Sequence, residues 1–382
     1  MKHASQLQLL CGGVAFFSAL IQAIDAANNE VHLETYIFDT RGAGQEVALA
    51  LERAAFRGVR VNVLVDGVGT GKLPSPWAER FENAGVVCRV FSPVGALGLL
   101  GVWQPTRWRR LHRKLCVVDA RVAFCGGINI LDDFLDHRDG QPLQSPRLDF
   151  AFQIQGELVL AIHETVKTLW QGFQGMRAWR ISELLQAATP HHDKAQLVLR
   201  DNVRHRVQIE RAYRKAIGAA HHDIVVACAF FFPGLRLLRA LREAARRGVR
   251  VRLLLQGHYE YWVVYRAARQ LYGQLLAAGV EIYEYQASFL HAKVAVIDQH
   301  WLTVGSSNLD PLSLLLAREA NIVTKDKNLA LSLHQSLCLA IEQGATKVEP
   351  HKYLHRAWLE RVVDALAAAV LRFGVFLTGK RY

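Results

Sequence analysis

The sequence predicts an α/β protein made of two duplicated lobes, with its functional site at the interface between them. Three observations support this: the chain has 382 residues, short apolar runs alternate with helical patterns, and one polar motif occurs in each half. A chain of this length exceeds a typical single core, so two domains are expected. Alternating strands and helices are typical of α/β architecture, in which helices cover a sheet.

In the first half, the elements follow from hydrophobic periodicity and from glycine residues at helix ends. Helices are predicted at 14–27, 45–57 and 77–84, and strands at 30–38, 59–65 and 86–91. The apolar segment 7–24 could also be a signal peptide or a membrane anchor, but polar residues interrupt it and Asp25 follows directly. It also has a counterpart inside the chain at 196–220, so a strand plus a helix is expected.

The second half repeats the order of the first. Strands are predicted at 223–231, 249–255 and 280–285, and helices at 234–247 and 266–278. Residues 52–60 match 242–250 at an offset of 190, and a repeat of this length indicates duplicated domains rather than a solenoid. The expected units are a first lobe (1–175), a second lobe (196–345) and a C-terminal amphipathic helical tail (346–382). The tail helix at 358–377 is expected either to dock on the core or to lie on a membrane.

One polar motif, H-x-K-x4-D-x6-G-[GS]-x-N, follows the strand pattern in each half. The first copy runs from His112 to Asn129 and the second from His291 to Asn308, so the copies lie 179 residues apart. His and Lys are two residues apart at an apolar run, and in a strand they would share a face. A single pair of this kind is usually an exposed strand face, but two copies are not plausible as chance. The active site is therefore expected between the lobes.

The residue types of the motif favour a phosphate diester as the ligand. Two His, two Lys and two Asn form a cationic cage with hydrogen-bond donors on several sides. Paired His could instead indicate zinc, but Lys beside each His would repel a dication, and neither H-E-x-x-H nor C-x-x-C occurs. We therefore expect neither a metal nor another cofactor.

Both copies resemble the HKD motifs of the phospholipase D superfamily, with Gly127 where Ser is more usual. The resemblance covers nearly the whole chain, and the segments 229–233, 245–250 and 304–313 are similar to those of bacterial cardiolipin synthases, the B type in particular. It implies two phospholipase D-like α/β sandwich lobes and a catalytic set of His112, Lys114, Asp119, His291, Lys293 and Asp298.

The resemblance also implies a role for each group. His112 would be the nucleophile that forms a phosphohistidine and His291 the acid and base, although the near-symmetry leaves the reverse assignment open. Phosphate contacts are expected from the lysines and from Gly127, Asn129, Ser306 and Asn308. Asp149 and Glu319, which follow the motifs, are expected to orient the imidazoles. Asp119 and Asp298 begin turns, so a turn or salt-bridge role is the stronger expectation for them.

The net charge of +12 predicts an acidic partner, either nucleic acid or an anionic membrane. An insertion at 95–110, apolar and then rich in Trp and Arg, favours the membrane. The expected reaction joins two phosphatidylglycerol molecules into cardiolipin and glycerol, at the cytoplasmic side of the bacterial inner membrane by peripheral attachment. Nucleic acid is not expected. Lipid hydrolysis, a phosphodiester nuclease and a noncatalytic membrane-binding scaffold are the alternatives. The six Cys lack paired spacing and are expected to be buried free thiols.

Overall fold

The computed structural model describes residues 5–93, 109–172, 195–201, 205, 207–258, 262–310 and 317–377. Most of the insertion at 95–110 lies outside these ranges. From the sequence we also expect a link between the lobes at 171–195 and a basic C-terminal end with Lys380 and Arg381. The link lies largely, and the basic end wholly, outside these ranges.

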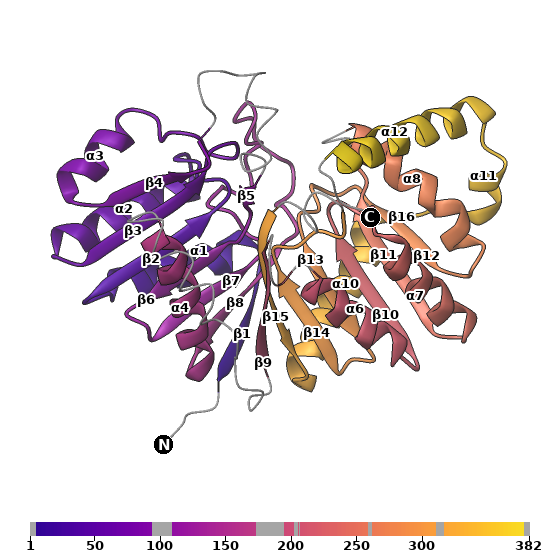
Figure 1. The fold of residues 1–382 in the computed structure, drawn as a ribbon, viewed down its shortest axis with the longest axis horizontal. Helices are drawn as coiled ribbons and strands as arrows, with labels where there is room; N and C mark the ends of the chain where they lie inside the picture. The colour runs from indigo at the N-terminus through magenta and orange to yellow at the C-terminus, as the bar shows by residue number, and fades with distance from the viewer. Residues whose placement is uncertain are drawn as a thin grey trace.

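The first sheet has seven strands in the order β1-β8-β7-β6-β2-β3-β4 (Figure 1). Its β2, β3 and β4 are parallel, and the motif strands β6 and β7 join them through antiparallel pairing. The strands are β1 (Gln6–Cys11), β2 (Glu30–Thr35), β3 (Arg60–Asp66), β4 (Val87–Phe91), β6 (Leu115–Val118), β7 (Val122–Gly126) and β8 (Phe150–Gln155).

The second sheet has nine strands and repeats this plan. Its order is β16-β12-β11-β10-β13-β14-β15-β5, with β9 also paired to β15. The strands are β5 (Arg110–Leu111), β9 (Ala195–Arg200), β10 (Asp223–Cys228), β11 (Arg250–Gln256), β12 (Glu281–Tyr285), β13 (Lys293–Ile297), β14 (Trp301–Gly305), β15 (Ala317–Thr324) and β16 (Ala345–Lys347). Strand β5 comes from the first half of the chain, so the two halves are joined by backbone pairing.

Helices cover the sheets in three large hydrophobic clusters, beside a small fourth one around Leu111 and Trp170. The first cluster packs α1, α2 and α3 on the first sheet, the second packs α6, α7 and α8 on the second sheet, and the third joins α4 and α10 to strands of both sheets. The apolar core is therefore continuous across the interface between the lobes. The helices are α1 (Gly12–Asp25), α2 (Ala43–Phe56), α3 (Trp77–Ala84), α4 (Glu157–Gly172), α6 (Gln208–Gly218), α7 (Leu235–Arg246), α8 (Trp262–Leu276), α10 (Lys327–Gly344), α11 (Pro350–Leu354) and α12 (Trp358–Leu377).

Most of the predicted order is confirmed. Segment 7–24 is a strand plus a helix: β1 pairs with β8, and α1 buries Phe16, Phe17 and Leu20. The strands predicted at 30–38 and 223–231 were too long, since they end at Thr35 and Cys228. The residues beyond them leave the sheet for the motif loops, as described below.

Helix α12 docks on α8, so the first of the two placements predicted for the tail, contact with the core, is confirmed for one side of the helix. Ala367 and Ala368 are buried there, and the carboxylate of Asp364 forms ion pairs with Arg266 and Arg356 at 2.7 and 2.6 Å. Among the residues that the structure describes, no helix is both long enough and apolar enough to cross a membrane. All six Cys are free thiols, as expected. Burial is confirmed for Cys116, Cys125 and Cys228, whereas Cys88 and Cys338 are half-buried and Cys11 is exposed.

Candidate active site

The two motifs meet where the lobes touch. The backbone N–H of His112 donates to the carbonyl of Arg318 at 3.1 Å, and the N–H of His291 donates to the carbonyl of Leu148 at 2.9 Å. A bridge between Leu148 and Leu290 adds to this contact. Each motif histidine is therefore fixed by backbone of the opposite lobe.

The two carboxylates that were expected to orient the imidazoles lie on their ring nitrogens, and the pairing is crossed. Glu319 of the second lobe contacts Nδ1 of His112 at 3.0 Å, and Asp149 of the first lobe contacts Nδ1 of His291 at 2.6 Å. Both carboxylates are almost fully buried. Neither lobe alone holds a complete pair, which no feature of the sequence had indicated.

The tautomer of His112 follows from a second contact. Its Nδ1 also lies 3.1 Å from the carbonyl oxygen of Ser306. A carbonyl oxygen only accepts hydrogen bonds, so Nδ1 carries the proton and Nε2 holds a free lone pair. This is the tautomer that a nucleophilic imidazole needs.

Burial is the largest influence on the charges of the site. It lowers the pKa of both histidines, that of His291 well below its ordinary value, and nearby Lys side chains lower both further. Burial also lowers the pKa of Lys114 to about 7. The carboxylates differ from one another: burial raises the pKa of Asp149 to about 7, whereas for Glu319 the effects of His112, Lys114 and Ser306 outweigh burial and lower the pKa.

The two half-sites differ at the second motif Gly/Ser position, as well as in having Asp149 in one and Glu319 in the other. Ser306 donates from Oγ to Glu319 at 2.5 Å, and this bond helps keep Glu319 ionised. The equivalent position is Gly127, where a Cβ would lie 2.2 Å from Oδ1 of Asp149. No hydroxyl fits there without displacing Asp149, so the half-sites differ for a steric reason.

The motif lysines lie beside the two imidazoles, and each bonds the backbone carbonyl of its own motif histidine. Nζ of Lys114 donates to the carbonyl of His112 at 2.7 Å, and Nζ of Lys293 donates to the carbonyl of His291. Both ammonium groups are buried beside the imidazoles. Together they provide positive charge that a phosphate would neutralise.

Each motif Asn is oriented by the residues that follow the first strand of its lobe. Oδ1 of Asn129 accepts from the N–H of Ile37 at 3.2 Å, and Oδ1 of Asn308 accepts from the N–H of Phe230 at 3.4 Å. This is why the two strands end early, and it leaves the NH₂ group of each amide as the donor toward a ligand. A pocket at this point is lined by Ile37, Ile128, Asn129, Leu131, Asp133, His137, Arg147, Asp149 and His291.

Asp119 and Asp298 lie away from the imidazoles, at the far ends of β6 and β13. Asp119 accepts from the backbone N–H groups of residues 28, 29 and 30, and Asp298 from those of residues 221, 222 and 223, all at 2.8–2.9 Å. Both residues have positive φ, near 50°. Their place in the predicted catalytic set is therefore corrected to that of turn residues, which secure the start of β2 and β10.

Two positioning residues were missed from the sequence. Asp66, at the end of β3, accepts the N–H of Leu111 at 2.8 Å, and Gln256, at the end of β11, bonds both the N–H and the carbonyl of Leu290 at 3.3 Å. Each fixes the residue that precedes a motif histidine. They are related by the same offset of 190 that aligns residues 52–60 with 242–250, so the repeat itself could have identified them. Tyr36, whose ring lies 5.1 Å from that of His112, was also missed.

Among the described residues, one group could hold a metal: Glu30, His32 and His163, on β2 and α4. It contains no motif residue. Its donors already bond one another, with Nε2 of His163 2.7 Å from Glu30, and Arg60 lies 3.2 Å from the same carboxylate. Positive charge so near disfavours a dication, and none of the chemistry below depends on this group.

Fold and site together define a duplicated α/β protein of the phospholipase D class. The chain belongs to the family described as cardiolipin synthase, PLD-like domain, whose model matches residues 20–139 and 213–337. It is 38% identical over 380 residues to cardiolipin synthase B of Salmonella typhi, covering 99% of this chain and 90% of that one. It is 29% identical over 367 residues to a cardiolipin synthase of Halalkalibacterium halodurans, covering 96% and 71%. The fold is similar to that of phosphatidylserine synthase of Haemophilus influenzae Rd KW20, with a TM-score of 0.72 at 15% identity over 97% and 93% of the two chains.

Proposed function

We propose that this protein is a cardiolipin synthase that transfers a phosphatidyl group from one phosphatidylglycerol to another and releases glycerol. The observation that carries the chemistry is the crossed pair of buried histidines, each held at Nδ1 by a carboxylate of the other lobe. The choice of lipid is supported by relatives named cardiolipin synthase B, which are 37–38% identical over 99% of the chain.

In the first step, the donor phosphate lies among Lys114, Lys293 and the NH₂ groups of the motif Asn residues. Nε2 of His112 attacks the phosphorus with its lone pair, and the bond from phosphorus to the glycerol oxygen breaks. His291 gives its Nε2 proton to that oxygen while protonated Asp149 gives a proton to Nδ1, and glycerol leaves. The enzyme then holds the phosphatidyl group as a phosphohistidine.

In the second step, a hydroxyl of another phosphatidylglycerol occupies the place of the departed glycerol. His291 takes the hydroxyl proton, the oxygen attacks phosphorus, and the bond from phosphorus to His112 breaks to release cardiolipin. Because the pKa of Asp149 is raised to about 7, the pair of His291 and Asp149 exchanges a proton near neutral pH, as an acid and base must. The lower pKa of Glu319 suits a partner that keeps His112 in its nucleophilic tautomer.

Partners and location follow from the substrate. We infer that the partner is an anionic phospholipid, phosphatidylglycerol, rather than nucleic acid, and that attachment is peripheral on the cytoplasmic side of the bacterial inner membrane. Extraction of the protein by carbonate or high salt would support peripheral attachment, and resistance to both would contradict it.

The function is tested with purified protein and phosphatidylglycerol labelled in its headgroup glycerol. Equal amounts of cardiolipin and free glycerol are expected, whereas phosphatidic acid without cardiolipin would show that water is the acceptor. His112→Ala should form no product. His221→Ala should behave as wild type, because it changes an exposed side chain and keeps the backbone N–H that bonds Asp298. Lipid analysis of a cardiolipin-deficient bacterium expressing the chain extends the test to cells.

A further inference from the structure

The outer side of α12 carries a continuous row of exposed apolar side chains, here called the outer stripe. Their exposed fractions run from 43% at Val362 to 68% at Trp358. At about 100° per residue, they lie on the side of the helix opposite Asp364, Ala367 and Ala368, which face α8. The outer stripe consists of Trp358, Leu359, Val362, Leu366, Val370 and Phe373.

Charged residues are excluded from this stripe. Asp364 lies on the inner side of the helix, while Glu360, Arg361 and Arg372 lie on its flanks. A helix that faces water on its outer side normally carries polar residues there, so this pattern requires an explanation. Docking on α8 does not supply one, because that contact uses the other side.

The first turn of α8 extends the apolar surface. Arg266 meets Glu360 and Asp364, whereas Tyr353, which precedes α12, meets Arg269 at the other end of the contact. The two helices therefore run antiparallel, and the start of α8 lies beside the second half of α12 (Figure 1). Two exposed apolar side chains stand at that start, Trp262 at 55% and Val263 at 37%.

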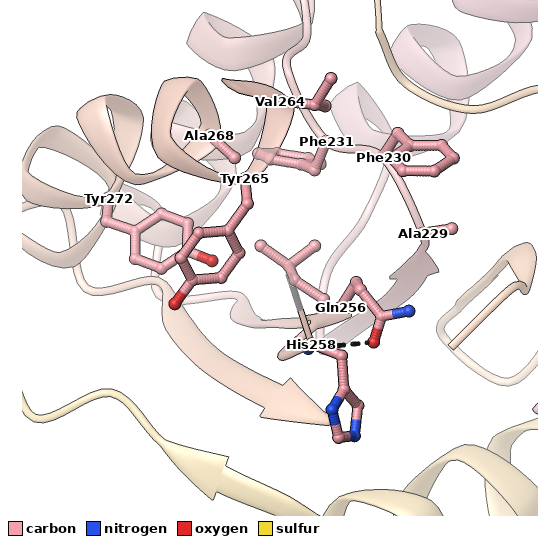
Figure 2. Close-up of a pocket in the computed structure, with 10 residues that line it drawn as sticks. Ala229, Phe230, Phe231, Gln256, His258, Val264, Tyr265, Ala268 and Tyr272 are labelled. Carbon is pink, nitrogen blue, oxygen red and sulfur yellow. Dashed lines mark hydrogen bonds between the residues drawn. The ribbon is translucent and has the colours of Figure 1, made fainter. Parts of the chain in front are cut away.

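Helix α12 also contacts the loop that leads to the active site. The guanidinium of Arg372 lies 5.6 Å from the ring centre of Phe232, and the N–H of Phe230, two residues earlier, donates to the motif Asn308. A pocket between this loop and α8 has Gln256 on its wall, the side chain that fixes the residue before His291 (Figure 2). It is lined by Ala229, Phe230, Phe231, Leu255, Gln256, His258, Val264, Tyr265, Ala268 and Tyr272.

We propose that the outer stripe of α12, together with Trp262 and Val263, inserts into the interface of an anionic phospholipid bilayer and holds the Phe230–Phe232 side of the active site against the lipid. The inference rests on the proposed function for the identity of the lipid. A bilayer fits better than a second copy of this chain, because the protein carries a net charge of +12 and exposed Arg361 and Arg372 flank the stripe. Basic residues at such a surface attract anionic headgroups, and a copy of equal charge would be repelled.

The test measures binding of the full chain to phosphatidylcholine vesicles with and without phosphatidylglycerol. The test variant carries Val362→Ser, Leu366→Ser and Val370→Ser, at exposed fractions of 43–61%. The control variant carries Val14→Ser, Leu160→Ser and Leu331→Ser at 42–74% exposure on other helices. Because interfacial binding scales with the apolar area inserted, the test variant should bind at least about tenfold more weakly, and the control should bind as wild type.

Turnover of a dispersed short-chain phosphatidylglycerol distinguishes a failure of the membrane-binding proposal from a failure of the proposed function. The test variant should keep its rate on this substrate, since the stripe touches no motif residue, while His112→Ala should lose turnover and keep vesicle binding. If wild type turns over no lipid but vesicle binding still depends on the stripe, the proposed function is wrong and the membrane-binding proposal is supported.

Two outcomes would overturn the proposal that the outer stripe inserts into a bilayer. In one, the test variant binds vesicles as wild type does. In the other, it changes only the oligomeric state measured by sedimentation, which would make the stripe a subunit interface. Trp358→Phe gives a second measure without loss of an apolar side chain: it should diminish the blue shift of Trp fluorescence on vesicle addition, and an undiminished shift contradicts insertion.

Discussion

Ser306→Ala should shift the acid limb of the profile of activity against pH to higher pH. The variant removes one donor from the carboxylate of Glu319, to which Ser306 Oγ is bonded at 2.5 Å between two fully buried side chains. With that donor gone, the carboxylate becomes more basic. It then holds the Nδ1 proton of His112 more strongly and raises the pKa of the imidazole.

The magnitude follows from the kind of bond. A hydrogen bond to a buried charged group contributes about 1.5–3 kcal/mol, and one pKa unit corresponds to about 1.4 kcal/mol. The combined titration of His112 and Glu319 should therefore rise by about 1–2 pH units. The form with the extra proton has no free lone pair at Nε2, so the inactive state persists to higher pH.

The assay is kcat/KM against pH with a dispersed short-chain phosphatidylglycerol. In Ser306→Ala the acid limb should shift upward by at least about one pH unit, and the rate above the limb should largely recover. Thr303→Val is the matched control, because it also removes a fully buried hydroxyl, one that accepts from Asn321 and does not touch Glu319. Its acid limb should not move.

The reasoning is refuted if the limb of Ser306→Ala stays in place while the plateau falls, because the hydroxyl would then support structure without setting the charge of Glu319. A downward shift would show that the coupling between the carboxylate and the imidazole has the opposite sign. An equal shift in Thr303→Val would assign the effect to general loosening of β14.

Four further predictions concern the intermediate, the substrate charge, metals and stability. A pulse with a labelled donor whose leaving group needs no proton, followed by alkaline denaturation, should leave phosphohistidine on His291→Ala and none on His112→Ala; label on His112→Ala alone would reverse the roles. Because the pKa of Lys114 is about 7, a bound phosphate anion should raise this pKa and cause proton uptake near pH 7. Calorimetry of phosphate binding in buffers of different ionisation enthalpy measures the uptake, and its absence would contradict the prediction. EDTA should leave turnover unchanged, and restoration of lost activity by a divalent ion would refute the side-chain mechanism. Asp298→Asn should lower stability by roughly 1–2 kcal/mol after solvent screening, because its three backbone N–H bonds outweigh burial and hold its pKa below the ordinary value. That stabilisation is present above pH 4 or so and fades as pH falls through the folded pKa, so the loss measured in urea should shrink in acid.

The sequence predicted the parts of the site that lie at fixed spacing. His112, Lys114 and Asn129 share one short run, and the second copy of the run showed that the spacing was not accidental. Asp149 and Glu319 were also predicted, because an imidazole needs an acceptor on its second nitrogen and the family resemblance points to these positions after the motifs.

The crossing of the pairs could not be predicted in this way. Spacing along the chain says which residues follow a strand, but which His each carboxylate meets depends on how two sheets pack. That packing is decided by a large apolar cluster contributed by both lobes, and apolar side chains carry no directional code. For the same reason, the sequence does not predict the hydrogen bonds that His112 and His291 donate to carbonyls of the opposite lobe.

The strand ends were missed for a different reason. Residues 36–38 and 229–231 are apolar enough to continue a strand, and propensity alone extends the strand through them. In the structure, the amides of Asn129 and Asn308 take the N–H groups of Ile37 and Phe230 that a neighbouring strand would otherwise have bonded. The strand ends are therefore decided by Asn side chains 92 and 78 residues away in the sequence, which a local pattern does not include.

The crossed pairing of His112 with Glu319 and of His291 with Asp149 bears on why both lobes lie in one chain. Two identical lobes meeting as a dimer would have to present two identical pairs, since any substitution would appear on both sides of the axis. Within a single chain each half can change alone, and position 127 has Gly where position 306 has Ser. The covalent link thus permits a division of labour between two histidines that symmetry would otherwise keep equal.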